Sequence, residues 1–258
     1  MKLTFLGTGT SFGVPVVGCD CAVCTSDDPR NRRTRHALLI EREGRRLLVD
    51  TPPELRLQLV TAGVRGIDAV YITHPHADHV HGIDDLRAFT VRSGSRLPVH
   101  VAAEYADEMR RRFPYFWGPG AGPAPGTTIP ELELRTFRDR EEPDIPGFRL
   151  RAIGFPHGPM RSYGFRIGDL GVIVDAKRVP EDAVSLLEDV PTLVLNALWF
   201  GSPHPTHFNV EEAVAVAERL RAGRTFLTHL THRLEHRDLE RRLPPAVRPA
   251  WDGLTIDV

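Results

Sequence analysis

Short apolar runs alternate along the chain with amphipathic stretches, a pattern typical of an α/β protein. Residues 37–40 and 46–50 flank Glu43-Gly44, a pair that favours a tight hairpin turn. The remaining apolar runs predict strands over residues 3–6, 68–73, 98–101, 148–155, 162–167, 171–174, 192–197, 224–228 and 254–258. The sequence therefore predicts β-sheets that are covered by helices.

Helical spacing of apolar residues separates these strands. It predicts helices over residues 53–62, 78–91, 104–113, 180–188 and 209–221. Asp78 is the expected N-cap of the second helix. Asn209 is the expected N-cap of the last helix, with Glu212 at the capping-box position.

Residues 114–130 interrupt the pattern, because this segment is too rich in glycine and proline for regular structure. Its aromatic residues are unusual for a solvent loop. A lid, a dimer contact and a surface loop with a packed aromatic tip all remain open as interpretations.

Composition narrows the class of protein. The 258 residues are 41% hydrophobic, which is enough for one large domain spanning residues 1–258. No apolar stretch reaches the length of a membrane span, and the N-terminus lacks the features of a secretory signal. We therefore expect a cytoplasmic protein without membrane contact.

The charge is nearly balanced, with 33 basic and 34 acidic residues and a net charge of −1. A protein that grips nucleic acid nonspecifically would carry a basic excess. Nucleic acid is therefore not the expected partner.

The strongest chemical signal is the segment from Thr73 to His79, which follows an apolar strand. His74 and His76 are two residues apart and point the same way from an extended chain. Asp78 and His79 lie at the start of the next helix and face another direction. This arrangement suits two adjacent metal ions, and imidazole with carboxylate suits zinc, manganese or iron.

The segment resembles the HxHxDH motif of the metallo-β-lactamase superfamily. The resemblance implies an αββα sandwich, in which two mixed β-sheets are flanked by helices, and a binuclear metal site. It also implies further ligands at later strand ends, where the sequence has His157, Asp175 and His229. By resemblance, one ion is held by His74, His76 and His157, the other by Asp78, His79 and His229, and both by Asp175.

Three cysteines lie close together at Cys19, Cys21 and Cys24. An odd cluster in a cytoplasmic chain argues against disulfides and for a metal site or reactive thiols. Structural zinc takes four ligands, and His232 is the candidate for the fourth.

The Gly7-Thr8-Gly9-Thr10-Ser11 segment, the cysteine loop and the segment from Thr228 to His232 narrow the resemblance. Together they look like the phosphoribosyl cyclic phosphodiesterases of bacterial phosphonate breakdown. In that group, the cysteine loop and a C-terminal histidine bind a structural zinc apart from the active site. A group of pyrroloquinoline quinone biosynthesis proteins also carries cysteine loops.

The resemblance implies hydrolysis of small cyclic phosphodiesters, such as ribose 1,2-cyclic phosphate or 2′,3′-cyclic nucleotides, to phosphomonoesters. A bridging hydroxide between two Mn²⁺ or Zn²⁺ ions would attack phosphorus. His207 is expected to protonate the leaving group or to stabilise charge, and Asp78 to take part in catalysis besides binding metal. The group also allows a homodimer.

Three other functions remain open. An RNA-processing nuclease of the same superfamily shares the ligand pattern, but the charge balance and the lack of a long basic insertion argue against it. A hydrolase of thioesters, lactones or lactams is the second alternative. A non-catalytic metal carrier is the third, and the complete set of seven ligand candidates argues against it.

Four other residues carry weaker expectations. Asp50 ends a strand, and we expect its carboxylate to orient a ligand histidine. His36, His100 and His236 have no partner in the sequence, and we expect them at the surface or as local caps.

Overall fold

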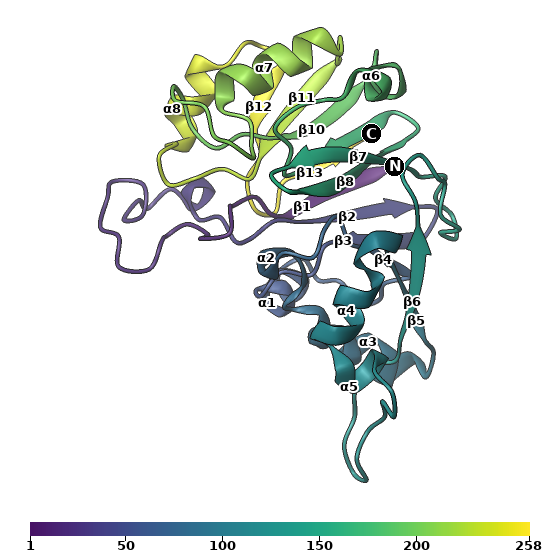
Figure 1. Ribbon diagram of the computed structural model, residues 1–258. Helices are drawn as coiled ribbons and strands as arrows, with labels where there is room; N and C mark the ends of the chain where they lie inside the picture. Colours follow the sequence, from purple (N-terminus) through teal and green to yellow (C-terminus); the bar gives the residue numbers. More distant parts are fainter.

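The computed structural model describes residues 1–258 as two β-sheets packed face to face, with helices on the outer side of each (Figure 1). This is the αββα arrangement of two mixed sheets that the sequence analysis expected. None of the helices combines the length and the apolar character that a membrane crossing requires.

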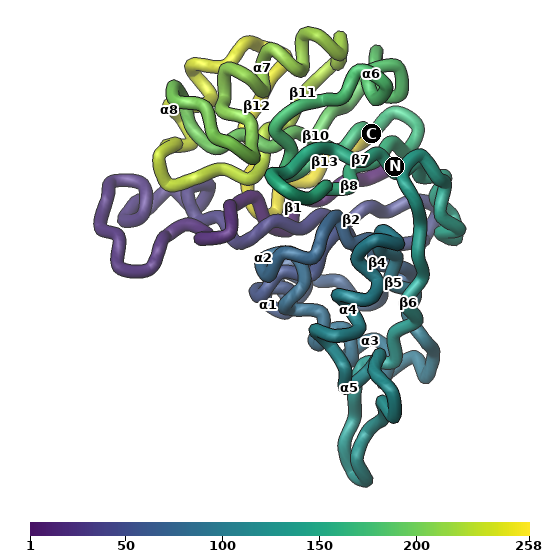
Figure 2. Tube along the Cα trace, viewed as in Figure 1, coloured from purple at the N-terminus to yellow at the C-terminus, as the bar shows by residue number.

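The first sheet has the strand order β13-β1-β2-β3-β4-β5-β6. Its strands are β1 (Lys2–Gly7), β2 (Ala37–Arg42), β3 (Arg45–Val49), β4 (Ala69–Tyr71), β5 (Leu97–Ala102), β6 (Leu132–Phe137) and β13 (Thr255–Asp257). The pairs from β13 to β3 are antiparallel, and those from β3 to β6 are parallel. Because β13 pairs with β1, the two chain ends lie side by side, as Figure 2 also shows.

The second sheet has the order β12-β11-β10-β9-β8-β7. Its strands are β7 (Arg151–His157), β8 (Met160–Ile167), β9 (Leu170–Ile173), β10 (Thr192–Asn196), β11 (Arg224–Thr228) and β12 (Val247–Pro249). The pairs from β7 to β9 are antiparallel, and those from β9 to β12 are parallel.

Short helices complete the outer layers. Beside the first sheet lie α1 (Leu55–Thr61), α2 (Ala77–Val80), α3 (Arg87–Ser93), α4 (Ala106–Arg112) and α5 (Pro114–Trp117). Beside the second lie α6 (Glu181–Leu187), α7 (Val210–Arg219) and α8 (His236–Arg242). Three 3₁₀ turns are η1 (Pro29–Asn31), η2 (Ile83–Leu86) and η3 (Ala103–Tyr105).

Two apolar cores hold the layers together. The larger core lies between the sheets and continues under α3 to α5, and it includes aromatic side chains from both sheets. The Tyr71 ring stacks on Phe137 with 4.9 Å between centroids and meets Phe165 edge-on at 5.3 Å. The smaller core joins the second sheet to α6, α7 and α8. Burial of these apolar faces supplies the main driving force for the sandwich.

Two local predictions from the sequence are confirmed. β2 and β3 form a hairpin, and Glu43 and Gly44 at its turn both have positive φ, at 51° and 77°. In α7 the Asn209 side chain accepts from the backbone of Glu212, whose own side chain accepts from the backbone of Asn209.

The predicted helix over residues 78–91 is wrong in two respects. The segment divides into α2, η2 and α3, and the N-cap is His76 rather than Asp78, which lies in the first turn. The division has a clear cause, because the backbone of Thr51 intervenes. Thr51 donates to the carbonyl of His79 at 2.7 Å and accepts from the N–H of Gly82 at 2.8 Å.

Among the strands and α-helices, four escaped prediction, namely β6, β12, α5 and α8. The expected surface positions of His36, His100 and His236 are also wrong, because each side chain is at most 1% exposed. Their neutral rings fill interior space made by segments distant in sequence, which local patterns do not reveal.

Residues 114–130 are irregular except for the short helix α5. Phe113 and Phe116 stack with 5.6 Å between centroids, and the Trp117 indole N–H donates to the carbonyl of Leu132. The aromatic residues thus pack against their own neighbourhood. The rest of the segment projects from the molecule at the bottom of Figures 1 and 2.

His100 lies in β5 opposite Tyr71, and its Nε2 has no hydrogen-bond partner. Burial lowers the pKa of His100 to about 4, with Arg135 adding to the effect. Its neutral ring therefore contributes stability above pH 6.5, the ordinary pKa of histidine, and this contribution is lost as pH falls toward 4.

The free energy of unfolding is therefore expected to fall between pH 7 and pH 4.5. In His100→Leu this fall should be smaller by roughly 2 kcal/mol, because leucine has no proton to gain. Urea unfolding at both pH values measures this, and parallel losses in the two proteins would contradict it.

Candidate metal centre

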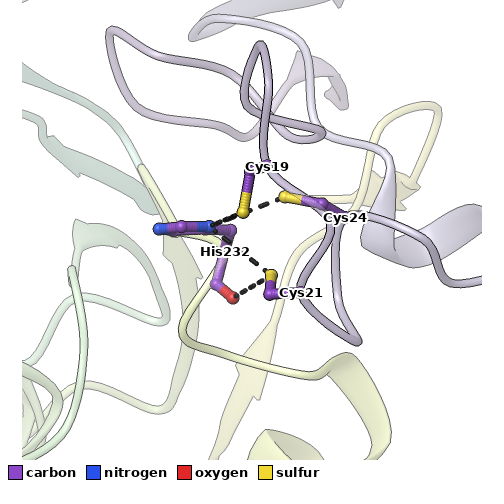
Figure 3. A group of neighbouring side chains, drawn as sticks. All are labelled: Cys19, Cys21, Cys24 and His232. Atoms are coloured by element: carbon purple, nitrogen blue, oxygen red, sulfur yellow. Dashed lines mark hydrogen bonds between the residues drawn. The ribbon is translucent and has the colours of Figure 1, made fainter.

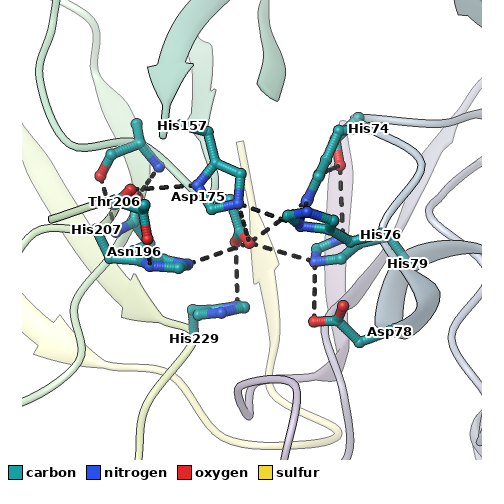
Figure 4. A network of polar contacts seen from close by, with 12 residues as sticks. His74, His76, Asp78, His79, His157, Asp175, Asn196, Thr206, His207 and His229 are labelled. Atoms are coloured by element: carbon teal, nitrogen blue, oxygen red, sulfur yellow. Dashed lines mark hydrogen bonds and ion pairs between the residues drawn. The ribbon is translucent and has the colours of Figure 1, made fainter. Parts of the chain in front are cut away.

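The candidate metal ligands converge where strand ends of both sheets meet. Residues 73–79 follow β4, and Asp50 follows β3 in the first sheet. His157 ends β7, Asp175 follows β9 and His229 follows β11 in the second sheet. In Figure 4, Asp175 lies between histidines contributed by the two halves of the chain.

Three of these strand-end residues have a left-handed backbone. The φ angles are 64° at Asp50, 54° at Asp175 and 60° at His229. Aspartate and histidine tolerate this region better than most residues, but it still costs energy that surrounding structure must repay. The sharp turn at each strand end aims the side chain at the centre rather than along the sheet.

Four side chains form the first group of candidate ligands. The Nδ1 of His76 lies 2.9 Å from the Nε2 of His74 and 3.3 Å from the Nε2 of His157. The Oδ2 of Asp175 lies 3.7 Å from the Nε2 of His74 and 3.8 Å from the Nε2 of His157. All four ligand atoms lie within 4.8 Å of one another.

The second group consists of His79, Asp175 and His229, whose ligand atoms also lie within 4.8 Å of one another. The Nε2 of His79 is 3.5 Å from the Oδ2 of Asp175, and the Nδ1 of His229 is 3.2 Å from its Oδ1. Asp78 stands outside this compact group, but its Oδ2 lies 3.3 Å from the Nε2 of His79. Asp175 thus belongs to both groups of candidate ligands, and its bridging of two ions stays a prediction.

Outer contacts fix the orientation of the histidines. The Nδ1 of His79 lies 2.7 Å from the Oδ2 of Asp50, which also accepts from the hydroxyl of Thr73. The Nδ1 of His157 donates to the carbonyl of Thr206 at 3.2 Å. Such partners set which ring nitrogen faces a metal.

The role of Asp50 was foreseen from its strand-end position, whereas other supporting residues were missed. The Asn196 side chain bonds both backbone groups of Ala176 and so holds the turn at Asp175. Thr206 acts partly through its carbonyl, which every residue has. Neither contact has a signal in the sequence.

Burial and charge set the protonation states. Burial lowers the pKa of His74 well below its usual value, lowers that of His157 and lowers that of His229 to about 3. These imidazoles are neutral, so their lone pairs are free to bind metal. Burial raises the pKa of Asp175, but interactions with His229, His79 and His207 outweigh burial and hold its pKa well below the usual range.

His79 differs from the other histidines. Burial lowers its pKa, but the carboxylates of Asp78, Asp50 and Asp175 outweigh burial and raise the pKa well above the ordinary value. Three carboxylates around one buried ring make a positive charge at this position favourable. A divalent cation supplies that positive charge as well as a proton on the ring does.

Unpartnered atoms also fit metal ions. The Nε2 of His79, the Oδ1 of Asp175 and the Nδ1 of His229 are buried without a hydrogen-bond partner. Buried polar atoms are almost always satisfied in proteins, and these three face the same centre. The donor set of imidazole and carboxylate therefore fits divalent ions of the zinc and manganese type.

His207 lies at the rim of the centre, with 13% of its side chain exposed. Its Nε2 lies 3.2 Å from the Oδ2 of Asp175, and its Nδ1 lies 2.8 Å from the hydroxyl of Thr206. Its ring stacks on that of His229 with 4.9 Å between centroids. His207 is therefore close to the candidate ligands without belonging to either group.

A separate cluster contains Cys19, Cys21, Cys24 and His232 (Figure 3). The three sulfurs lie 3.3 Å, 3.6 Å and 3.5 Å from the Nδ1 of His232. The backbone N–H of Cys24 lowers the pKa of the Cys21 thiol to about 6, which favours the thiolate that binds metal. Three sulfurs around one imidazole nitrogen make a donor set that suits zinc.

The αββα fold, with candidate metal ligands at its strand ends and a carboxylate shared between them, is typical of one class of protein, the metal-dependent hydrolases. A family model for the beta-lactamase superfamily domain matches residues 45–230. The chain belongs to the metallo-β-lactamase superfamily, whose relatives include hydrolases of phosphodiesters.

Individual relatives are similar over almost the whole chain. The crystal structure of a diphosphatase from the PhnP family aligns with a TM-score of 0.90 and 35% identity, covering 100% of this chain and 97% of that one. A ribonuclease Z of Bradyrhizobium diazoefficiens is 26% identical, covering 92% of each protein. An octanoyltransferase of Porphyromonas gingivalis is 34% identical over 98% of this chain, which spans about half the length of that relative (51%).

Asp50→Asn is expected to weaken metal binding at the second group by about 10- to 100-fold, because the amide no longer fixes the N–H tautomer of His79. Competition with a chromogenic chelator measures the affinity. The matched control is Asp85→Asn in η2, whose side chain makes no hydrogen bond or ion pair. Equal affinities in the two variants would contradict the assigned role of Asp50.

Cys21→Ser is expected to remove about one zinc ion per chain, because a closed four-ligand site rarely survives loss of a thiolate. The melting temperature should fall by about 5 °C or more. Elemental analysis and thermal unfolding measure both effects, and Ala22→Ser at an exposed position of the same loop is the control. Full zinc content in Cys21→Ser would argue against a metal site in this cluster.

Proposed function

We propose that the chain hydrolyses small phosphodiesters at a centre that holds two divalent ions. The favoured substrates are cyclic diesters, such as ribose 1,2-cyclic phosphate or 2′,3′-cyclic nucleotides. The position of Asp175 carries the proposal, because its Oδ2 lies within 3.7 Å of His74 in the first group and 3.5 Å of His79 in the second, while its Oδ1 lies 3.2 Å from His229. A carboxylate in that position suits two ions held close together.

His74, His76 and His157 would hold one ion, and Asp78, His79 and His229 the other, with Asp175 contacting both. Two divalent ions, Mn²⁺ or Zn²⁺, supply Lewis acidity and an activated water at neutral pH. The cluster of Cys19, Cys21, Cys24 and His232 would hold a third ion, a structural zinc.

Two side chains would transfer protons during the reaction. Asp78 is 13% exposed beside His79, where its carboxylate would accept a proton from the attacking water. His207 presents its Nε2 at the rim of the centre, where it would protonate the departing alkoxide oxygen. The contact between its Nδ1 and the hydroxyl of Thr206 fixes the ring for that transfer.

The relatives support cleavage of a bond between phosphorus and oxygen. One aligned structure is that of a diphosphatase, and the ribonucleases Z match over nearly the full chain. Both activities displace an oxygen leaving group from phosphorus. The similarity to an octanoyltransferase covers about half of that protein. Because of this similarity, the test panel below includes a thioester and a lactone as acyl substrates.

A nuclease is the second candidate function, because several ribonucleases Z are 26% identical over most of their length. The net charge of −1 disfavours it, since long nucleic acids bind through a basic surface. Comparing turnover of a precursor tRNA with turnover of 2′,3′-cyclic nucleotides under the same conditions distinguishes the two functions.

The test is hydrolysis by protein loaded with Mn²⁺ or Zn²⁺. The panel contains bis-p-nitrophenyl phosphate, 2′,3′-cyclic nucleotides, ribose 1,2-cyclic phosphate, a diphosphate-bridged dinucleotide, a precursor tRNA, a thioester and a lactone. We expect turnover of cyclic diesters, and a fall of about 1,000-fold or more in His76→Ala, which lacks a metal ligand.

His207→Gln separates proton transfer from metal binding. We expect kcat to fall by about 100-fold or more at little changed KM, with metal content retained. Absence of diester turnover in a protein with two or more bound metals would overturn the proposed function. Turnover of the thioester or lactone alone would replace it with the acyl hydrolase.

A further inference from the structure

A small cavity of about 220 Å³ lies between the segment that follows β1 and the loop that follows β11. It is lined by Thr10, Phe12, Val16, Trp199, Thr231, His232 and Arg233. Three of these seven residues are hydrophobic, and two of those three are aromatic. The polar lining residues include Arg233 and His232, which belongs to the cysteine cluster described above. None of the functions assigned above uses Phe12, Trp199 or Arg233.

Contacts connect the cavity to the candidate metal centre. The Trp199 ring meets His204 edge-on, with 5.5 Å between centroids, and the Nδ1 of His204 lies 3.3 Å from the Nδ1 of His207. On the opposite wall, Thr231 follows His229 by two residues. A chain of contacts through His204 thus links the Trp199 wall of the cavity to His207 at the rim of the centre.

The aromatic rings of the lining lie outside the apolar cores, although the Trp199 indole N–H donates to the carbonyl of Ser202. Phe12 and Trp199 belong to neither apolar core, and Phe12 is 71% exposed. An exposed ring, here Phe12, beside a partly buried one, here Trp199, at a concave site is typical of ligand contacts. The guanidinium carbon of Arg233 lies 4.5 Å from the centre of the Trp199 ring, which holds the indole and adds positive charge.

We propose that this cavity receives the aromatic base of a nucleotide whose phosphodiester occupies the metal centre. The inference rests on the proposed function and specifies its substrate class. The volume accommodates one ring system rather than a polymer, and aromatic side chains stack on any base. The charge of Arg233 complements an anionic nucleotide.

The kinetic test compares two substrates that differ only in the base. They are adenosine 2′,3′-cyclic phosphate and the 2′,3′-cyclic phosphate of methyl riboside, in which a methoxy group replaces adenine. Phe12→Ala is expected to raise KM for the adenosine substrate at least tenfold, with a far smaller effect on the base-free substrate. Trp199→Ala should behave in the same way, and Trp199→Phe should largely restore the KM.

The control variant is Tyr115→Ala, which removes another exposed aromatic ring on α5, away from the cavity. It should leave both substrates unaffected. Equal KM changes for the two substrates in Phe12→Ala and Trp199→Ala would overturn the proposal, because the rings would then act on the whole site.

A binding measurement separates this inference from the proposed function. Isothermal titration of the unaltered protein with adenosine 5′-monophosphate is expected to show an affinity that falls at least tenfold in Phe12→Ala. If neither cyclic phosphate is hydrolysed but this loss of affinity is observed, the function fails and the base site stands. If the diesters are hydrolysed but adenosine monophosphate binds equally to both proteins, the base site fails and the function stands.

Discussion

The contact of one buried carboxylate with imidazoles from both halves of the chain organises this protein. Asp175 is 2% exposed, and its oxygens lie within 3.8 Å of nitrogens from His74, His79 and His229. An isolated charge at this depth would be very unfavourable, so the surrounding positive charge or a cation is a condition for folding as well as for chemistry. The sandwich brings the strand ends of both sheets together, and the carboxylate of Asp175 contacts histidines from both sets.

Buried hydrogen bonds hold the backbone and side chains around this contact in place. Asn196 closes a ring of hydrogen bonds with the backbone beside Asp175, and Asp50 with Thr73 fixes His79. These supports are buried strand-end residues and not surface loops. By contrast, His207 lies on a longer irregular loop that also carries Trp199, so the proposed proton donor and the cavity wall share one segment. The residues proposed to contact substrate thus lie on irregular backbone, whereas most candidate metal ligands lie at strand ends.

Local patterns predicted sheets covered by helices and the cluster of histidines at residues 73–79, whereas the αββα layers and the later ligand candidates came from the resemblance of that cluster to a known family. Alternating apolar runs define strands, and the histidines and aspartates follow directly at strand ends. Sequence reasoning failed where distant backbone intervenes. The backbone of Thr51 divides the helix expected over residues 78–91, and the interior positions of His36 and His100 depend on long-range packing. Asn196 gave no signal, since its partners are main-chain atoms.

The left-handed backbone at Asp50, Asp175 and His229 has an evolutionary consequence. Glycine occupies this conformation without strain, but glycine at Asp50 would also leave the buried N–H of Thr73 without its acceptor. The backbone strain at this turn is therefore offset by the same buried contacts that aim the side chain at the centre. Selection for heat resistance alone would consequently keep an aspartate at position 50, since its contacts stabilise the turn as well as orient His79.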